Sequence, residues 1–424
     1  MTMRFRSAGV IGLGYVGLPL SKLLVEHGLR VTGVDVDPKK IQALQAGTSY
    51  ISDLADDEVR RLMTGGAFEA AGDYDALIGV EAVIICVPTP IHEDGTPDLK
   101  YVELAGRRLE QLPLNGQLIV LESSTYPGTT EEVLLPILQR NGKAVGRDFY
   151  LAYSPERINP GDRRFRLSQM PKIISGVTDE CLRKVKALYS PVYEKVIPVS
   201  SPRAAEMAKV MENSQRFVNI SFMNEIVKFC EKMDINVWEV IEAANSKPYG
   251  NLPFYPGTGV GGHCIPVDPL YLQWKAEEIG CGSDFIRTAK KVNDSMPEYI
   301  VERVSRLFPD GSIRDKSLLL VGVTYKRDVN DLRESSAMRV MELLAERGAA
   351  VAYHDPMAPR IALQGRRLDS VELTAERLAS ADGVILLMDH SNVPVESIVA
   401  HARLVFDTTH AAGKLGTFDH VKLL

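Results

Sequence analysis

The fold of this chain is decided near its amino terminus by residues 7–35, which read SAGVIGLGYVGLPLSKLLVEHGLRVTGVD. The apolar run at 7–13 predicts a short buried strand, and residues 18–27 predict a helix that ends at Gly28. Residues 31–35 predict a second strand. Strand, glycine-rich turn, helix and strand in this order predict one βαβ unit of a parallel sheet.

Gly12, Gly14 and Gly17 form a GxGxxG motif, and Asp35 follows them at the end of the second predicted strand. In a Rossmann fold the three glycines permit a tight turn, the approach of a pyrophosphate and close packing of helix on strand. The start of the helix favours a phosphate, and an acid at the position of Asp35 binds ribose hydroxyls, which favours NAD. The alternative is a fold of this kind that binds no dinucleotide.

The composition excludes several classes of protein. A length of 424 residues predicts two or three domains. A net charge of −6 without a long basic run argues against nucleic-acid binding. No apolar run approaches the ~20 residues that cross a bilayer, and the early strand leaves no room for a signal peptide, so no membrane partner is expected.

The cysteines also bear on the class of protein. Five cysteines without a CxxC pair argue against a disulfide framework or a metal site and favour a cytoplasmic location. Four of them, Cys86, Cys181, Cys230 and Cys281, are interpreted as packing residues.

Further α/β alternation fills the region 1–200. Apolar strand runs at 82–87, 117–121 and 149–153 are followed by Thr89, Thr125 and Glu156. Ligands of open parallel sheets bind beyond the carboxyl ends of the strands, so these three side chains are candidates for a common crevice. The alternative is that each one only caps the next turn.

A long helical pattern runs from residue 201 to about residue 234. Its apolar residues recur at helical spacing, and a helix of this length between two domains favours a dimer interface over a helix buried in one subunit. Lys209, Asn213 and Arg216 share one face of it. That face is either solvated or directed at a reacting group. In the second case a lysine could lower the pKa of a thiol or hold a water, and an amide could stabilise an oxyanion.

The reacting group is predicted in the stretch 256–268, PGTGVGGHCIPVD. Four glycines in seven residues allow close approach of a ligand, and Cys264 supplies a nucleophile with Asp268 four residues later. The alternative is a glycine-rich loop with a structural cysteine.

The last region is a second α/β unit, with predicted strands at 317–323, 349–353, 382–388 and 404–407 and a helix at 335–347. Its first turn has no GxGxxG, so it need not bind a second dinucleotide. Lys326, Arg327 and Arg333 are candidates for a phosphate. The fold class is therefore α/β, with domains at 1–200, 201–310 and 311–424.

Taken together, the motifs resemble the UDP-glucose/GDP-mannose dehydrogenase family of nucleotide-sugar 6-dehydrogenases over nearly the whole chain. The matching stretches, in order, are GLGYVG at 12–17, PTP at 88–90, ST at 124–125, SPER at 154–157, Lys209 with Asn213, GVGGHCIPVD at 259–268, YK at 325–326 and DLRES at 331–335. The resemblance implies two Rossmann-like doubly wound domains joined by a long central helix, which builds a homodimer that can assemble further.

The resemblance also implies a chemistry, the four-electron oxidation of a sugar C6 alcohol to a carboxylate with two NAD. In this family the cysteine matching Cys264 attacks the C6 aldehyde, and the thiohemiacetal is oxidised to a thioester that water cleaves. Lys209 and Asn213 would flank the C6 oxygen, and Asp268 would orient Lys209 or a water. Thr125 and Glu156 would position the water.

Binding residues follow from the same resemblance. The residues expected at NAD are Gly12, Gly14, Tyr15, Val16, Gly17, Asp35, Thr89, Thr125 and Arg333. The residues expected at a UDP-sugar substrate are Arg157, Ile158, Lys209, Asn213, Arg216, Gly261 and Lys326.

Two stretches point to one branch of the family. The sequences SPERINPG at 154–161 and GHCIPVD at 262–268 are similar to the enzymes that act on UDP-N-acetylhexosamines, which favours UDP-GlcNAc 6-dehydrogenase activity for surface polysaccharide. UDP-glucose, UDP-ManNAc and GDP-mannose are the alternative substrates. Two other classes stay open: a two-electron NAD dehydrogenase of the hydroxyacid type, and a nucleotide-binding scaffold protein on the same fold.

Overall fold

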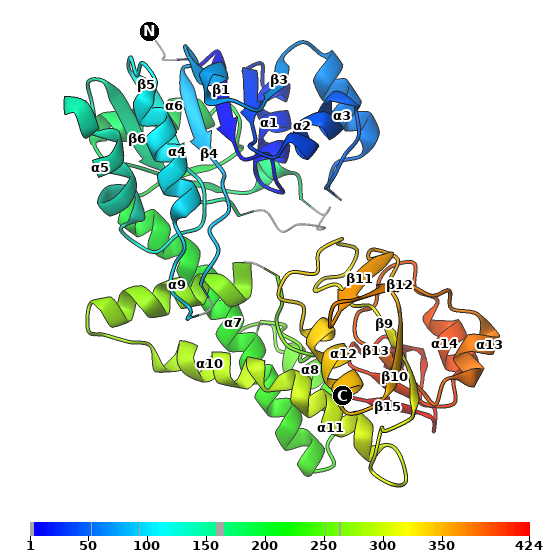
Figure 1. Ribbon diagram of the computed structural model, residues 1–424. Helices are drawn as coiled ribbons and strands as arrows, with labels where there is room; N and C mark the ends of the chain where they lie inside the picture. Colours follow the sequence, from blue (N-terminus) through cyan, green and yellow to red (C-terminus); the bar gives the residue numbers. More distant parts are fainter. Residues whose placement is uncertain (1–3, 52, 93, 158–164, 251, 263) are drawn as a thin grey trace. The chain divides into compact units, whose positions relative to one another are not determined.

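The computed structural model describes the chain except for residues 1–3, 52, 93, 158–164, 251 and 263 (Figure 1). The chain forms two compact units. Unit 1 comprises residues 1–213 and 267–282, and unit 2 comprises residues 214–266 and 283–424.

Unit 1 is built on a single sheet. Its strands are β1 (Ser7–Ile11), β2 (Arg30–Val34), β3 (Phe68–Ala71), β4 (Ala82–Ile85), β5 (Gln117–Leu121), β6 (Phe149–Tyr153), β7 (Lys172–Gly176) and β8 (Val196–Pro198). Their spatial order is β3-β2-β1-β4-β5-β6-β7-β8. The first six strands run parallel in the 3-2-1-4-5-6 order of a Rossmann fold, which confirms the prediction. The strand β7, which pairs antiparallel to β6, was not predicted.

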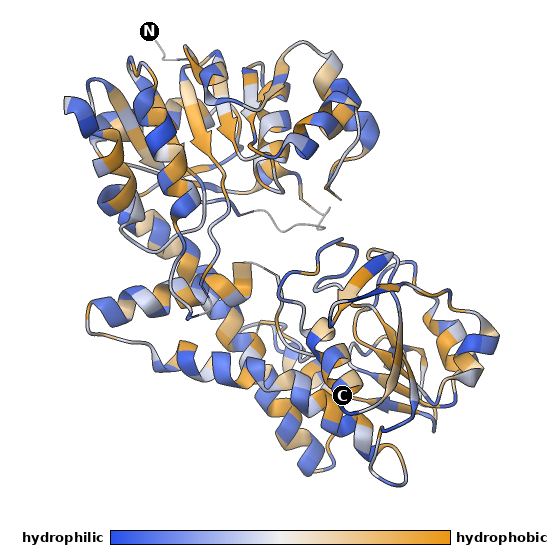
Figure 2. Cartoon of the chain, viewed as in Figure 1, coloured by the Kyte–Doolittle hydropathy of each residue, from blue (hydrophilic) through white to orange (hydrophobic). Residues whose placement is uncertain are grey.

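Both faces of this sheet are covered, because residues along each strand alternate in direction. On β5, Leu118 and Val120 belong to one apolar cluster, while Ile119 and Leu121 belong to another. The first cluster includes residues of α1 (Gly17–Glu26), α2 (Pro38–Gln45), α3 (Asp56–Thr64) and α6 (Asp179–Tyr189). The second includes residues of α4 (Lys100–Gln111), a short π-helical turn (Thr130–Leu134) and α5 (Leu135–Leu138). Figure 2 shows the hydrophobic character of the strands.

The predicted long helix is present as α7 (Pro202–Lys232), of 31 residues. At 1.5 Å per residue it is about 46 Å long. Its residues up to Asn213 belong to unit 1 and those from Ser214 belong to unit 2. Two more helices lie in unit 2, α10 (Asp284–Asp294) and α11 (Met296–Arg306). Unit 2 also contains α8 (Val237–Asn245).

Unit 2 has its own parallel sheet, which confirms the second α/β unit. The strands are β9 (Ser317–Val321), β10 (Ala350–His354), β13 (Gly383–Leu386), β14 (Val405–Asp407) and β15 (Val421–Leu423), in the order β10-β9-β13-β14-β15. The sheet is accompanied by α12 (Ser336–Glu346), α13 (Ala375–Ser380) and α14 (Val395–His401). An antiparallel hairpin of β11 (Arg360–Leu363) and β12 (Arg366–Asp369) was not expected from the sequence.

The two sheets share one local device at their first turn. Gly12 after β1 and Gly322 after β9 both have a left-handed backbone, with φ of 91° and 82°. An acid that follows the neighbouring strand then accepts the next backbone N–H: Asp35 from Leu13 at 2.8 Å, and Asp355 from Val323 at 2.6 Å. The second domain therefore repeats the Rossmann turn without the glycines that bind phosphate.

Candidate active site

Glycine is needed at each of the three motif positions of unit 1 for a different physical reason. A Cβ at Gly12 would lie 2.6 Å from the Cys86 carbonyl oxygen, and one at Gly17 would lie 1.9 Å from the Gly12 carbonyl oxygen. Side chains are therefore excluded at both positions by the protein itself. A Cβ at Gly14 would meet nothing within 4 Å. The space above Gly14 at the start of α1 fits the pyrophosphate of a dinucleotide.

Asp35 lies where the prediction places it, directly after β2, and is almost fully buried. Its carboxylate accepts from the backbone N–H groups of Leu13 and Asp37. Lys40, which the sequence reasoning missed, forms an ion pair with it at 2.7 Å. The acid is held rigidly at the end of the strand, as a ribose-binding carboxylate must be.

Thr89 and Thr125 follow β4 and β5, which are adjacent in the sheet. The Thr89 hydroxyl donates to the Ser124 carbonyl oxygen at 2.7 Å, so it holds the segment that carries Thr125. Thr125 is fully buried, and its hydroxyl has no hydrogen-bond partner among the described residues. A buried hydroxyl without a protein partner is a polar group available to a ligand or a water.

Lys209 and Asn213, four residues apart on α7, are both buried. Asn213 Nδ2 donates to Asp268 Oδ2 at 2.6 Å. Burial raises the pKa of Asp268 to about 6 from an ordinary value of 3.8, although the Lys209 charge and hydrogen bonds from Asn213 and Ser124 act to lower it. A carboxyl that titrates near neutral pH next to a lysine and an amide is suited to proton transfer.

Asp268 belongs to α9 (Cys264–Glu278), whose first residue is Cys264. The Cys264 side chain is exposed. Within unit 1, the helix is fixed by Tyr271, whose hydroxyl donates to the Pro90 carbonyl oxygen at 2.8 Å. Val267 and Tyr271 pack with Leu99 and Tyr126. Cys264 therefore precedes Asp268 by four residues in the chain, and the part of the helix within unit 1 is anchored beside the Thr89 segment.

The glycines before Cys264 are explained by contacts inside unit 2. A Cβ at Gly261 would lie 2.6 Å from the Glu334 carbonyl oxygen, and one at Gly262 would lie 2.5 Å from the Tyr325 ring. Gly262 also has φ of 82° and donates its N–H to the Arg333 carbonyl oxygen at 3.0 Å. The loop thus packs on the two motifs at 325–326 and 331–335.

Arg333, predicted at NAD, lies in unit 2 and pairs with Asp331 at 2.6 Å. That pairing raises the pKa of Arg333 against the effect of burial, and a thiolate at Cys264 would act in the same direction. The arginine is therefore close enough to Cys264 to interact with it electrostatically. Lys326 is half-buried in the same group of loops.

The substrate residues near β6 are only partly described. Arg157 forms a two-point ion pair with Glu212 of α7, at 2.6 and 3.2 Å. Ile158 lies outside the described residues. Arg216 follows Asn213 on the same face of α7, but its side chain is exposed, unlike the buried Lys209 and Asn213.

Glu156 is nearly buried after β6 and accepts from the Arg157 backbone N–H at 2.6 Å. Its other oxygen lies 3.3 Å from the Nζ of Lys172, a buried lysine that also pairs with Glu122 at 2.9 Å. Neither Lys172 nor Glu122 was expected at the site. A charged residue at a strand end looks like a surface residue in the sequence, so no signal could have identified either of them.

Glu206 is a second residue that the sequence reasoning missed. It is fully buried on α7, three residues before Lys209. Its carboxylate accepts from the backbone N–H groups of Gly128 and Thr130 and from the Thr130 hydroxyl. Burial raises its pKa. Glu206 therefore fixes the turn that follows Thr125.

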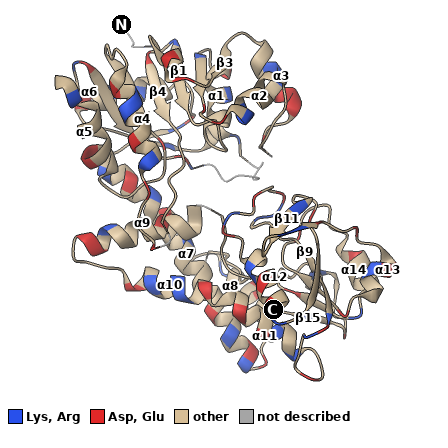
Figure 3. Ribbon diagram, viewed as in Figure 1, with Lys and Arg blue, Asp and Glu red and all other residues tan. Residues whose placement is uncertain are grey.

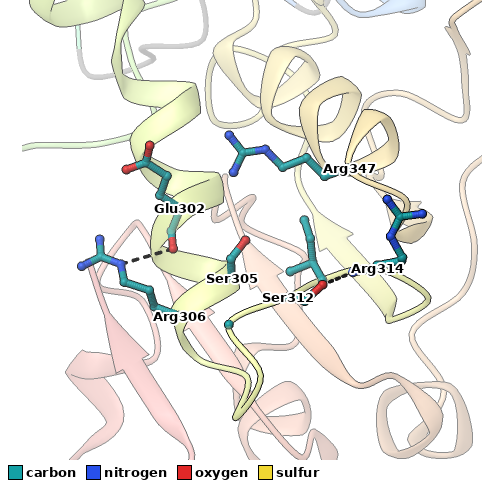
Figure 4. A pocket seen from close by; sticks show the side chains of 8 residues that line it. Glu302, Ser305, Arg306, Ser312, Arg314 and Arg347 are labelled. Atoms are coloured by element: carbon teal, nitrogen blue, oxygen red, sulfur yellow. Dashed lines mark hydrogen bonds between the residues drawn. The ribbon is translucent and has the colours of Figure 1, made fainter.

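Figure 3 shows acidic and basic residues intermixed on the helices of both units. A pocket of about 560 Å³ in unit 2 is lined by Arg306, Arg314 and Arg347 among others (Figure 4). Arg306 already pairs with Glu231, and Arg347 with Glu298. None of the predicted site residues lines it. Among the described residues, no helix is long and apolar enough to span a membrane.

A Rossmann unit with an intact glycine turn and a ribose acid defines a dinucleotide-binding protein, and the buried Lys–Asn–Asp group beside it is typical of an enzyme. Three family models match the chain: the NAD binding domain at residues 6–193, the central domain at 203–295 and the UDP binding domain at 319–414 of the UDP-glucose/GDP-mannose dehydrogenase family. The chain belongs to this family. It is an NAD-dependent nucleotide-sugar dehydrogenase, and its UDP binding domain indicates a UDP-sugar substrate.

Individual relatives agree with the family. The chain is 35% identical over 405 residues to a UDP-N-acetyl-D-mannosamine dehydrogenase of Yersinia pestis, covering 92% of this chain and 94% of the relative. It is 34% identical over 420 residues to an NDP-N-acetyl-D-galactosaminuronic acid dehydrogenase of Ralstonia nicotianae, covering 95% and 96%. The structure of a UDP-D-ManNAc dehydrogenase from Pyrococcus horikoshii matches with a TM-score of 0.85 and 29% identity, covering 95% of each chain.

Proposed function

We propose that this enzyme oxidises the C6 hydroxyl of a UDP-N-acetylhexosamine to a carboxylate in two steps, through a covalent intermediate on Cys264. The observation that carries the proposal is the buried hydrogen bond between Asn213 and Asp268, near Lys209, with Cys264 four residues before Asp268 in the chain. An exposed thiol followed by a buried proton-transfer group is the arrangement that this chemistry needs.

The groups have the following roles. NAD, when bound, accepts a hydride in each of the two oxidations. Lys209 and Asn213 hold the C6 oxygen, and Asp268, whose pKa is about 6, takes up and releases a proton beside them near neutral pH. The Cys264 thiolate adds to the aldehyde of the first oxidation, so that the aldehyde cannot diffuse away. The start of a helix favours the thiolate anion.

Hydrolysis then releases the product. The second oxidation converts the thiohemiacetal to a thioester, and a water that Thr125 and Glu156 position cleaves it. The unpartnered Thr125 hydroxyl supports this role. Contacts of the UDP-sugar with Arg157, Ile158, Arg216, Gly261 and Lys326, and of NAD with Tyr15, Val16, Thr89 and Arg333, remain predictions.

The sugar epimer is the finer part of the proposal. The relatives described above are named for N-acetylmannosamine and N-acetylgalactosaminuronic acid, which supports a 2-acetamido sugar but not the choice of UDP-GlcNAc. We therefore propose UDP-ManNAc as the first candidate substrate. The product is then a uronic acid that is used for surface polysaccharide.

The homodimer remains a proposal, and α7 supports it. Four large apolar side chains on this helix, Met207, Met211, Phe222 and Phe229, are 44–56% exposed. At 100° per residue they fall within about 60° of one another around the helix axis, so they form one apolar stripe. A second copy of the chain is the partner that the family resemblance implies. In light scattering the wild type should be dimeric, and Met211→Glu with Phe222→Glu should be monomeric.

A substrate panel tests the proposed activity. Purified enzyme with NAD is given UDP-ManNAc, UDP-GlcNAc, UDP-GalNAc and UDP-glucose, and NADH formation is followed by absorbance. We expect kcat/KM to be at least tenfold higher for one N-acetylhexosamine than for UDP-glucose. NADH formation with UDP-glucose alone would contradict the N-acetylhexosamine assignment, and no NADH with any of the four would contradict the activity.

A further inference from the structure

Lys172 lies in a buried charged cluster of which the proposed function uses only Glu156. The cluster comprises Glu122, Glu156, Lys172, Tyr189 and Tyr193, all less than 10% exposed and all in unit 1. Glu122 and Glu156 follow the adjacent strands β5 and β6, and Lys172 begins the next strand, β7. Three neighbouring strand ends therefore bring two carboxylates and one ammonium group together.

Several contacts fix the position of the Lys172 ammonium group. Lys172 Nζ lies 2.9 Å from Glu122 Oε2 and 5.2 Å from the ring centres of Tyr189 and Tyr193. Tyr189 donates its hydroxyl hydrogen to Glu122. The ammonium group is thus fixed from several sides, and it also lies 3.3 Å from Glu156 Oε2.

Sharing one cation between two carboxylates has an energetic consequence. Burial raises the pKa of Glu122, and the two carboxylates raise the pKa of Lys172 well above its ordinary value against the effect of burial. Lys172 therefore stays charged. A carboxylate that is buried beside a fixed cation has a defined position. Without the cation, the buried negative charge is costly and the carboxylate side chain must move.

We propose that Lys172 is a positioning residue for thioester hydrolysis. It holds the Glu156 carboxylate in the position from which this carboxylate orients the attacking water. The inference rests on the proposed function. In the step concerned, the water oxygen bonds to C6 and the C–S bond breaks. Glu156 accepts one water proton and later releases it, and the departing sulfur of Cys264 takes up one proton, so the thioester and water give a carboxylic acid and a thiol.

The test separates hydrolysis from hydride transfer. Lys172→Met, Lys172→Arg and the double variant Lys172→Met/Glu122→Gln are mixed rapidly with NAD and the best UDP-sugar of the panel. NADH is counted by absorbance, and the acyl-enzyme is detected by intact mass after acid quenching. In Lys172→Met the Glu122 carboxylate is left buried without its cation, which would destabilise the protein. The double variant removes that unpaired charge. Lys184→Met, a lysine of α6 that contacts the Tyr150 ring, is the matched control.

We expect Lys172→Met and the double variant to release two NADH per active site in a burst. Steady turnover should then be about 100-fold slower than in the wild type, which is the size of effect that a 1 Å displacement produces. The thioester should accumulate, with KM changed less than threefold. Lys172→Arg keeps the charge but moves the donors, so its hydrolysis should slow about tenfold. Lys184→Met should match the wild type.

Other results would overturn the proposal. It is wrong if the double variant hydrolyses the thioester at the wild-type rate, or if burst and steady rate fall together, as a merely structural role predicts. If the Met variants do not fold, Lys172→Arg replaces them in the test, and the same two results in that variant would overturn the proposal. Failure of the proposed function is seen separately, because wild-type enzyme would then form no NADH with any UDP-sugar. Glu156→Gln without thioester accumulation would also overturn the inference.

Discussion

Asp268 offers a prediction whose size follows from the structure. Its pKa is about 6 in the folded protein, against an ordinary value of 3.8. At 1.36 kcal/mol per pKa unit, this difference means that keeping the carboxylate ionised in the fold costs about 3 kcal/mol. Asp268→Asn removes the charge, and its amide oxygen still accepts from Asn213. The variant should therefore be more stable than the wild type at pH 8.

The size of this advantage depends on pH in a defined way. Above pH 6 the group is ionised in both folded and unfolded chains, so the folded state bears the whole cost. Between pH 6 and pH 4 the folded state keeps its proton while the unfolded state releases it, so the cost decreases as pH falls. The advantage of Asp268→Asn should shrink from about 3 kcal/mol at pH 8 to about 1.6 at pH 5 and about 0.5 at pH 4.

Thermal unfolding at pH 4, 5 and 8 measures this prediction. A difference of 3 kcal/mol corresponds to about 6–12 °C for a domain of 150–250 residues. Asp355→Asn in unit 2 is a control of opposite sign. Although burial acts to raise the pKa of Asp355, contacts with His390 and backbone N–H groups lower it overall, so that variant should lose stability at pH 8. Equal or lower stability of Asp268→Asn at pH 8 would refute the reasoning.

Three further predictions follow from the site. Gly17→Ala should fail to fold because its Cβ would lie 1.9 Å from a carbonyl oxygen, whereas Gly14→Ala should fold normally but bind NAD at least tenfold more weakly by calorimetry. Glu206→Ala should lower the free energy of unfolding in urea by about 3 kcal/mol, because it leaves the N–H groups of Gly128 and Thr130 buried without a partner. Cys264→Ser should bind NAD like the wild type yet stop turnover at or before the acyl-enzyme, and full activity in this variant would exclude the covalent route.

Local patterns made much of the fold predictable. The glycine turn before α1 and the acid after β2 occur within 35 residues, so the βαβ unit could be recognised from spacing alone. The helix α7 was recognisable because its apolar residues repeat at helical spacing over 31 residues. The antiparallel pairing of β7 was not predictable, because the residues of a short strand do not show which way it runs in the sheet.

The candidate site was predictable where a side chain belongs to a motif and not where it acts through distant contacts. Asp268 and Asn213 are 55 positions apart, and only the fold shows that they form a hydrogen bond. Lys172 meets Glu122 across 50 positions from an otherwise apolar strand. Such pairs carry no periodicity or spacing, so a single sequence does not reveal them.

The number of NADH molecules formed per molecule of UDP-N-acetylhexosamine tests the central claim most directly. With limiting sugar and excess NAD, oxidation of the alcohol to the carboxylate through Cys264 predicts two NADH per sugar and a uronic acid as the product. One NADH per sugar, with an aldehyde or ketone released into solution, would contradict it.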